Sequence, residues 1–252
     1  MSGDAYREVA PPPSLAPFVR TLWTYSAGTP SGEVQRIAPD GCPELIVHRA
    51  VPYEEQGPDG LWRPQPMAVF AGQLTRPLAL RPAGPVDLIA VRFHPDGARD
   101  WLGRPLVEVT DRRLDVTDRR LPHDLDALVA RLDGSRVRDG WGVDAAVRAA
   151  IEGAEVGRDP ARRRALQRRF RERVGVPLQT LRSIARFRRV FDHAAVPDAG
   201  AGAWLAAGLD AGYFDQPQLA RDFRRFLGCT ATAWAREQVE LARALASSSY
   251  KT

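Results

Sequence analysis

The first hundred residues carry short apolar runs separated by Pro- and Gly-rich breaks, and helical periodicity is weak there. Turn sequences such as Pro-Asp-Gly at 39–41 and 95–97 separate the runs. Many short strands with such turns are typical of an antiparallel sandwich or barrel. We therefore predict strands over residues 19–25, 44–51, 67–72, 78–80 and 86–93.

Beyond Ala98 the spacing of apolar residues becomes helical. Residues 125–132 follow Asp124, a residue type that caps helix N-termini. Residues 143–151 place Val143, Val147 and Ile151 on one helical face. We predict helices over both stretches, and a loop over residues 153–157.

Residues 161–175 (ARRRALQRRFRERVG) have the pattern of one amphipathic helix. Asp159 and Pro160 form a start signal, and Gly175 forms a stop signal. The apolar stripe, at i, i+4 and i+8, consists of Leu166, Phe170 and Val174. The opposite face carries Ala161, Arg164, Ala165, Arg168, Arg171 and Glu172, with Gln167 on its flank.

This outward face suits a DNA major groove, because Arg matches guanine edges and phosphates and Gln matches adenine. The alternative is a solvated Arg-rich helix without a partner. Charge favours the first interpretation. Residues 158–189 hold twelve Arg against Asp159 and Glu172. Residues 1–133 hold 15 Arg against 18 acids, whereas residues 134–252 hold 20 Arg and Lys251 against 13 acids. The C-terminal half is therefore expected to meet a polyanion.

A second unit of the same kind follows. A longer helix opens at Val176-Pro177, and its stripe consists of Leu178, Leu181, Ile184 or Ala185, Phe187 or Arg188, and Phe191. Residues 197–202 break the chain, residues 203–211 form a short helix, and Gly212 forms a turn. Asp215 caps a helix over 216–227, which Gly228 ends. Its inward residues are Leu219, Phe223 and Phe226, and its outward residues are Gln218, Arg221, Arg224 and Arg225. Two helix-turn-helix units on one linker helix can reach successive major grooves, about 34 Å apart.

The N-terminal half offers little for catalysis. Its polar candidates are Cys42, Glu44, His48 and His94. Glu44 and His48 are four residues apart on one strand and share a face. The two histidines lack the close spacing of metal ligands. These residues are either polar groups at strand edges or part of a small-molecule pocket formed by Glu44, His48 and His94, and a small cupin-like enzyme is an alternative. We expect no enzyme activity, no cofactor and no metal.

The remaining features indicate a cytoplasmic protein. Cys42 and Cys229 show no pairing pattern and fit a reducing compartment. Neither a signal peptide nor a run of about 20 apolar residues is evident, so no membrane partner is expected.

Two stretches resemble AraC-type transcriptional regulators. AGYFDQPQLARDFRRFLGCTATAW (residues 211–234) resembles the C-terminal signature of that family, and LQRRFRERVGVPLQTLRSIARFRRVF (residues 166–191) resembles its first recognition helix and linker helix. The N-terminal half resembles a sensor domain fused to such regulators. The matching pieces are PPPSLAPFVRTLW (11–23), APDGCPELIVH (38–48), AGQLTRPL (71–78) and VRFHPDGARDWLG (91–103).

The resemblance implies a DNA-binding regulator of two domains: an antiparallel, cupin-like sensor or dimerisation domain over 1–133 and an all-α tandem helix-turn-helix domain over 134–252. It implies double-stranded DNA as partner, and it leaves open a small-molecule effector, RNA polymerase and a homodimer. The DNA-contacting residues that it implies are Arg164, Gln167, Arg168, Arg171, Gln216, Gln218, Arg221 and Arg225.

The chain departs from the family pattern at three places. The window before the first recognition helix (GAEVGRDPARRR, 153–164) is too short and polar for the usual positioning helix. Gly208 costs about 1 kcal/mol in a helix interior, and Ala231 replaces the usual Pro. The alternative function is therefore a ligand- or protein-binding regulator that has lost sequence-specific DNA binding.

Overall fold

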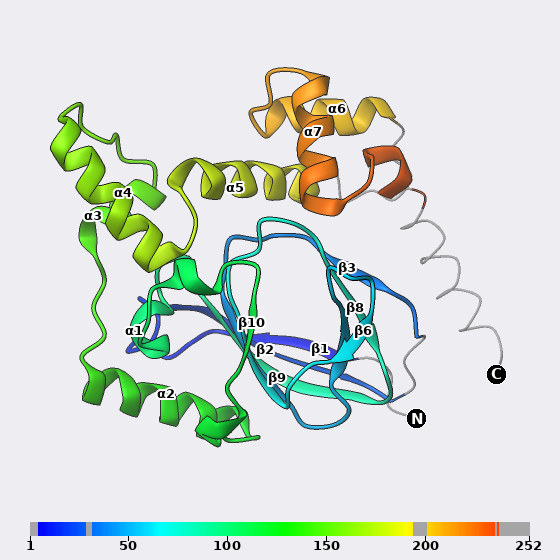
Figure 1. Ribbon diagram of the computed structural model, residues 1–252, viewed down its shortest axis with the longest axis vertical. Coiled ribbons are helices and arrows are strands. Elements are labelled where there is room, and N and C mark those ends of the chain that lie inside the picture. The colour runs from blue at the N-terminus through cyan, green and yellow to red at the C-terminus, as the bar shows by residue number, and fades with distance from the viewer. Residues whose placement is uncertain (1–4, 29–31, 194–200, 235, 237–252) are drawn as a thin grey trace.

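The computed structural model describes residues 5–28, 32–193, 201–234 and 236. Within them, ten strands precede a run of helices, so the predicted fold class is confirmed (Figure 1). The strands are β1 Ala5–Val9, β2 Val19–Ala27, β3 Gln35–Ile37, β4 Glu44–His48, β5 Tyr53–Gln56, β6 Trp62–Pro64, β7 Ala68–Ala71, β8 Leu78–Pro82, β9 Val86–Phe93 and β10 Arg113–Asp115.

The strands form two antiparallel sheets that face each other. The larger has the order β1-β2-β9-β4-β7-β10, and the smaller has the order β3-β8-β5-β6. β9 lies between β2 and β4 and is apolar on both sides. Ile89, Val91 and Phe93 join the core under the helices, whereas Leu88 and Ala90 face the space between the sheets. This period-2 alternation gives the larger sheet two buried faces.

The five predicted strands are confirmed, with ends shifted by up to three residues. The sequence pattern missed β1, β3, β5, β6 and β10. β3 is exposed along its whole length and β1 along most of it, so neither shows an apolar alternation. Short edge or hairpin strands such as these are held by backbone pairing, which no single stretch of sequence reveals.

Helices cover the outer face of the larger sheet. They are α1 Arg99–Leu102, η1 Leu106–Val109, η2 Thr117–Arg119 and α2 Leu125–Asp139. The predicted helix over 125–132 thus runs on to Asp139, and the expected domain division between residues 133 and 134 falls inside it. The reason is packing: Leu128, Leu132 and Trp141 all belong to the core of the β half, and Trp141 meets Phe18 edge-on at 5.5 Å between ring centroids.

The C-terminal half is helical as predicted. Its helices are α3 Ala145–Ile151, α4 Pro160–Val174, α5 Leu178–His193, α6 Ala201–Asp210 and α7 Gln216–Leu227. Val143 lies outside α3, contrary to expectation, because the Asp144 side chain caps that helix at the N–H groups of Ala146 and Val147. No helix within the described residues is long and apolar enough to cross a membrane.

α5 joins two small cores. At its start, Leu181 packs with Val147, Phe170 and Val174 of α3 and α4. Further along, Ile184, Phe187 and Val190 pack with α6 and α7. The side chain of Phe191 and residues 197–200 of the predicted break lie outside the described residues. One apolar stripe on α5 therefore holds both helical units, at opposite ends of the helix (Figure 1).

Candidate DNA-binding surface and β-domain cavity

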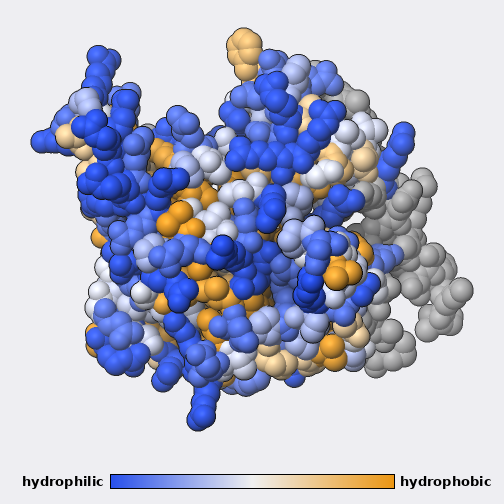
Figure 2. Space-filling model, in the orientation of Figure 1, coloured by the Kyte–Doolittle hydropathy of each residue, from blue (hydrophilic) through white to orange (hydrophobic). Residues whose placement is uncertain are grey.

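The outward face of α4 forms as the sequence pattern predicts. Asp159 caps the helix through the N–H of Ala161, and Gly175 ends it in a left-handed conformation. Four of the expected DNA-contacting residues on this helix are exposed: Arg164, Gln167, Arg168 and Arg171. Figure 2 shows a largely hydrophilic surface over α4.

Two residues expected on this face, Ala165 and Glu172, are half-buried. Glu172 points back to the β half, where the Arg99 guanidinium donates to its carboxylate at 2.8 Å. An isolated helical wheel could not place it, because α4 packs against two different partners on its rear side.

α7 presents a second outward face. Asp215 caps it by accepting the N–H of Gln218 at 2.7 Å. Gln216, Arg221 and Arg225 are exposed, as expected of DNA-contacting residues. Gln218 is half-buried, and its side-chain oxygen accepts the N–H of Phe214 at 3.1 Å. One acceptor position of its carbonyl oxygen is thus used in the turn, and its amide N–H groups are left to meet a base.

A polar network fixes α7 against α5. Asp222 accepts from the Tyr213 hydroxyl at 2.8 Å and from Arg186 at 3.2 Å. Burial and the bond to Asp222 raise the pKa of Tyr213, so the phenol stays protonated. The Arg186 guanidinium also lies 4.4 Å from the centroid of the Tyr213 ring. The network sets the orientation of the outward face of α7.

The helix before α7 packs unusually close to it. A Cβ at Gly208 would lie 2.8 Å from Cδ2 of the buried Leu219. The glycine that the sequence suggests is a weak point of α6 therefore lies at a close helix-helix contact.

The first unit lacks the equivalent long partner helix. Residues 152–159 contain no helix in the structure, and the element directly before α4 is the seven-residue α3. A shortened first unit, expected from residues 153–164, stays a prediction with which this arrangement agrees.

A cavity of about 500 Å³ lies between the two sheets. Even-numbered positions of β4 point into it, so Glu44, Ile46 and His48 share its wall. The structure thus brings Glu44 and His48 together. Much of the remaining wall is aromatic or aliphatic, and includes Trp23, Tyr25, Tyr53, Leu78, Leu80 and Leu88.

Glu44 is the centre of a charged group at one end of the cavity. It accepts from the Arg92 Nε at 2.7 Å and from the Trp23 indole at 3.2 Å. Arg92 also lies 3.3 Å from Asp40. Burial, followed by the charge of Asp40, raises the pKa of Glu44 to about 7, although Arg92 opposes the shift.

His48 is buried in the wall, and neither ring nitrogen has a hydrogen-bond partner of acceptable geometry within the described residues. Burial lowers its pKa, with Gln65 opposing the shift, so the imidazole is neutral at pH 7. His94 lies apart from this cavity, after the end of β9, where its Nε2 is 3.2 Å from the backbone oxygen of Ala16.

The helical half forms part of the cavity wall. Arg188 of α5, Leu227 of α7 and Trp234 all contribute to its lining. The Arg36 guanidinium of β3 donates to the backbone oxygen of Leu227 at 3.3 Å. None of these residues stood out as a pocket residue in the sequence, because they come from distant segments with no shared motif.

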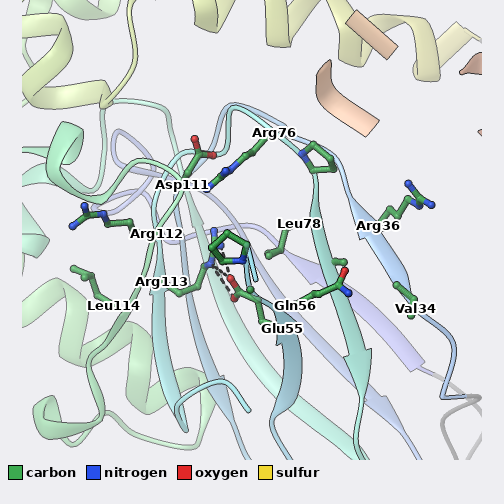
Figure 3. Close-up of a pocket in the computed structure, with 14 residues that line it drawn as sticks. Val34, Arg36, Glu55, Gln56, Arg76, Leu78, Asp111, Arg112, Arg113 and Leu114 are labelled. Carbon is green, nitrogen blue, oxygen red and sulfur yellow. Dashed lines mark hydrogen bonds and ion pairs between the residues drawn. The ribbon is translucent and has the colours of Figure 1, made fainter. Parts of the chain in front are cut away.

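A second, open cleft of about 800 Å³ lies beside β5, β8 and β10. Figure 3 shows Arg113 and Glu55 pointing toward each other in it, and their ion pair is bidentate. Asp111 accepts from the hydroxyl and the N–H of Thr75. No group of three or more His, Cys, Asp or Glu side chains suited to a metal occurs within the described residues.

Comparison with known proteins gives one family match. The model described as "Domain of unknown function (DUF6597)" matches residues 7–115, which is less than half of the chain. No curated protein matches.

Among solved structures, similar chains include an apo variant of ToxT from Vibrio cholerae strain SCE256, with TM-score 0.43 and 10% identity over 85% of this chain and 96% of that one. ToxT from Vibrio cholerae O395 gives TM-score 0.41, 9% identity and the same coverage. Unsaturated fatty acid bound wild-type ToxT from strain SCE256 gives 0.41 and 8% identity, over 85% and 94%. TM-scores below 0.5 do not establish a common fold, so these similarities carry no functional inference for this chain.

Proposed function

We propose that this protein is a DNA-binding transcriptional regulator of the AraC type, which reads major-groove sequence through α4 and α7. One observation carries the proposal: two capped helices with exposed Arg and Gln side chains stand at the two ends of one linker helix. At 1.5 Å per residue, the 16 residues of α5 span about 24 Å. Such a linker can serve two neighbouring turns of one groove.

We further propose that the β half is the sensor and that it takes a small molecule in the cavity of Glu44 and His48. Because the roof of the cavity belongs to α5, α7 and Trp234, an occupant would touch the DNA-reading half directly. We place the sensor in residues 1–141, which include all of α2, and the DNA-reading half from α3 onward.

The first test is DNA binding by the full chain. Duplexes are selected from a random pool, and affinity for the selected duplex and a scrambled one is followed by fluorescence anisotropy across a salt series. We expect tight binding to the selected duplex, with affinity falling steeply with salt as phosphate contacts release counterions. Equal affinity for both duplexes would contradict sequence reading. It would favour the alternative, a regulator that has lost specific DNA binding, which the non-helical residues 152–159 suggest.

Arg221→Ala tests one base contact. We expect a loss of about 1–3 kcal/mol that is confined to one base pair of the selected duplex. The matched control is Arg131→Ala, which removes the same charge from an exposed position on α2. A uniform loss on every duplex would assign Arg221 to a phosphate instead.

A further inference from the structure

The C-terminal end of α4 is docked on the β half. The Arg173 Nη1 lies 3.3 Å from the Asp100 carboxylate of α1, and Arg99 donates to Glu172 at 2.8 Å. The Thr110 hydroxyl, just after η1, donates to the backbone oxygen of Gly175 at 2.7 Å. Three separate polar contacts thus tie the last turn of the helix to one segment of the β half.

The backbones at this junction are also in direct contact. Gly175 has φ +88°, and a Cβ there would lie 2.9 Å from the backbone oxygen of Leu106. A residue larger than glycine would force the two segments apart. On the same side, Phe170 and Val174 are buried against α3. The end of α4 is therefore closely packed against its neighbours and does not form a hinge.

The short helix α3 belongs to the same support. Its Arg148 forms a bidentate ion pair with Asp96, which is only 4% exposed. The Arg148 guanidinium also donates to the backbone oxygen of Pro17 at 2.7 Å. Asp144, the cap of α3, forms a bidentate ion pair with Arg169 of α4. The seven residues of α3 therefore link α4 to the β half instead of bracing it independently.

The other end of α4 has no such support. Residues 161–164, which include Arg164, are exposed, and within the described residues the ion pair of Arg162 is with Asp159 of its own cap. The helix is thus held at its C-terminus and presents its N-terminal turns. This orientation suits a recognition helix, whose N-terminal residues contact base edges.

We propose that the α1–η1 segment of the β half takes the place of the missing positioning helix, with Asp100 and Thr110 as positioning residues for α4. The β half is then a working part of the first DNA-reading unit and not a separable sensor. Any movement of α1 and η1 would therefore also move α4. The bracing stands on the contacts above, and its effect on DNA reading rests on the proposed function.

The test exchanges one ion pair in the full chain. The variants are Asp100→Arg, Arg173→Asp and the double variant, which restores opposite charges and the original net charge. Asp118→Arg and Arg120→Asp make the same charge changes at exposed positions of the β half. Thr110→Val, which is nearly isosteric, serves as the mild variant should a charge reversal prevent folding.

The first readout is amide hydrogen exchange, which needs no DNA. We expect both single variants to speed exchange in residues 160–174 at least tenfold, with residues 216–227 unchanged, and the double variant to return within threefold of the parent. Thr110→Val should speed exchange in the last turn of α4 alone. Unchanged exchange in α4, or equal changes in the two surface controls, would overturn the bracing.

The second readout is hydroxyl-radical footprinting on the selected duplex. We expect the single variants to lose protection of one half-site and about tenfold in affinity, while the other half-site stays protected. The double variant should recover both. Suppose that hydrogen exchange shows α4 loosened in the single variants while footprinting shows both half-sites still protected. That result would overturn the role of the bracing in DNA reading. A parent chain that selects no sequence would instead defeat the proposed function, with the exchange result still deciding the bracing.

Discussion

At the scale of single residues, Glu44 shows how a strand position acquires chemistry through burial. Its folded pKa of about 7 lies above the ordinary value of 4.5. The folded state therefore holds a proton that the unfolded state releases, and the stabilisation present below pH 4.5 is lost as pH rises to about 7. Gln cannot ionise, so we expect Glu44→Gln to remove this pH-dependent change in the free energy of unfolding, which amounts to roughly 3 kcal/mol. Urea denaturation of both proteins at pH 5 and pH 8 measures the difference. Parallel pH profiles would show that Arg92 keeps Glu44 ionised throughout.

At the scale of elements, two helix glycines that look alike in sequence are expected to respond oppositely. Gly134 lies in α2 with open space around its missing Cβ, whereas Gly208 lies in α6 against Leu219. Gly134→Ala should raise the free energy of unfolding by about 1 kcal/mol, through helix propensity alone. Gly208→Ala gains the same propensity but overpacks a buried contact, and overpacking costs about 1–3 kcal/mol. We expect it to destabilise the protein. Denaturation curves for the two variants give both signs, and a stabilised Gly208→Ala would mean that Leu219 can move aside.

At the scale of the whole molecule, the two halves should unfold as one unit because buried charges join them. The Asp96–Arg148 pair crosses the junction, and its carboxylate side chain is 1% exposed. Removing one member of such a pair leaves the other charge buried, at a cost of about 3 kcal/mol or more. We expect Asp96→Ala to lower stability and to split calorimetric unfolding into two transitions. Asp59→Ala, which breaks the exposed pair with Arg63, should leave one transition unchanged. A single transition in Asp96→Ala would contradict this coupling.

Much of the helical half could be predicted from local pattern. The bounds of α7, the cap at Asp159 and the stop at Gly175 follow from side-chain identity and spacing within a few residues. β9 and the start of β4 could be predicted equally well, because each contains a run of apolar residues between turn signals. The exposed edge strands carried no such signal, since their partners lie far away in the chain.

The sequence by itself determined the fold class, the two outward Arg/Gln faces and the shared face of Glu44 and His48, because helix and strand periodicity depend only on neighbours in the chain. Tertiary structure alone decided that Glu172 turns inward, that Arg92 meets Glu44, that Gly208 is a contact residue and that α4 rests on α1 and η1. Each of these features brings together residues that are far apart in sequence, and only packing in three dimensions decides such contacts.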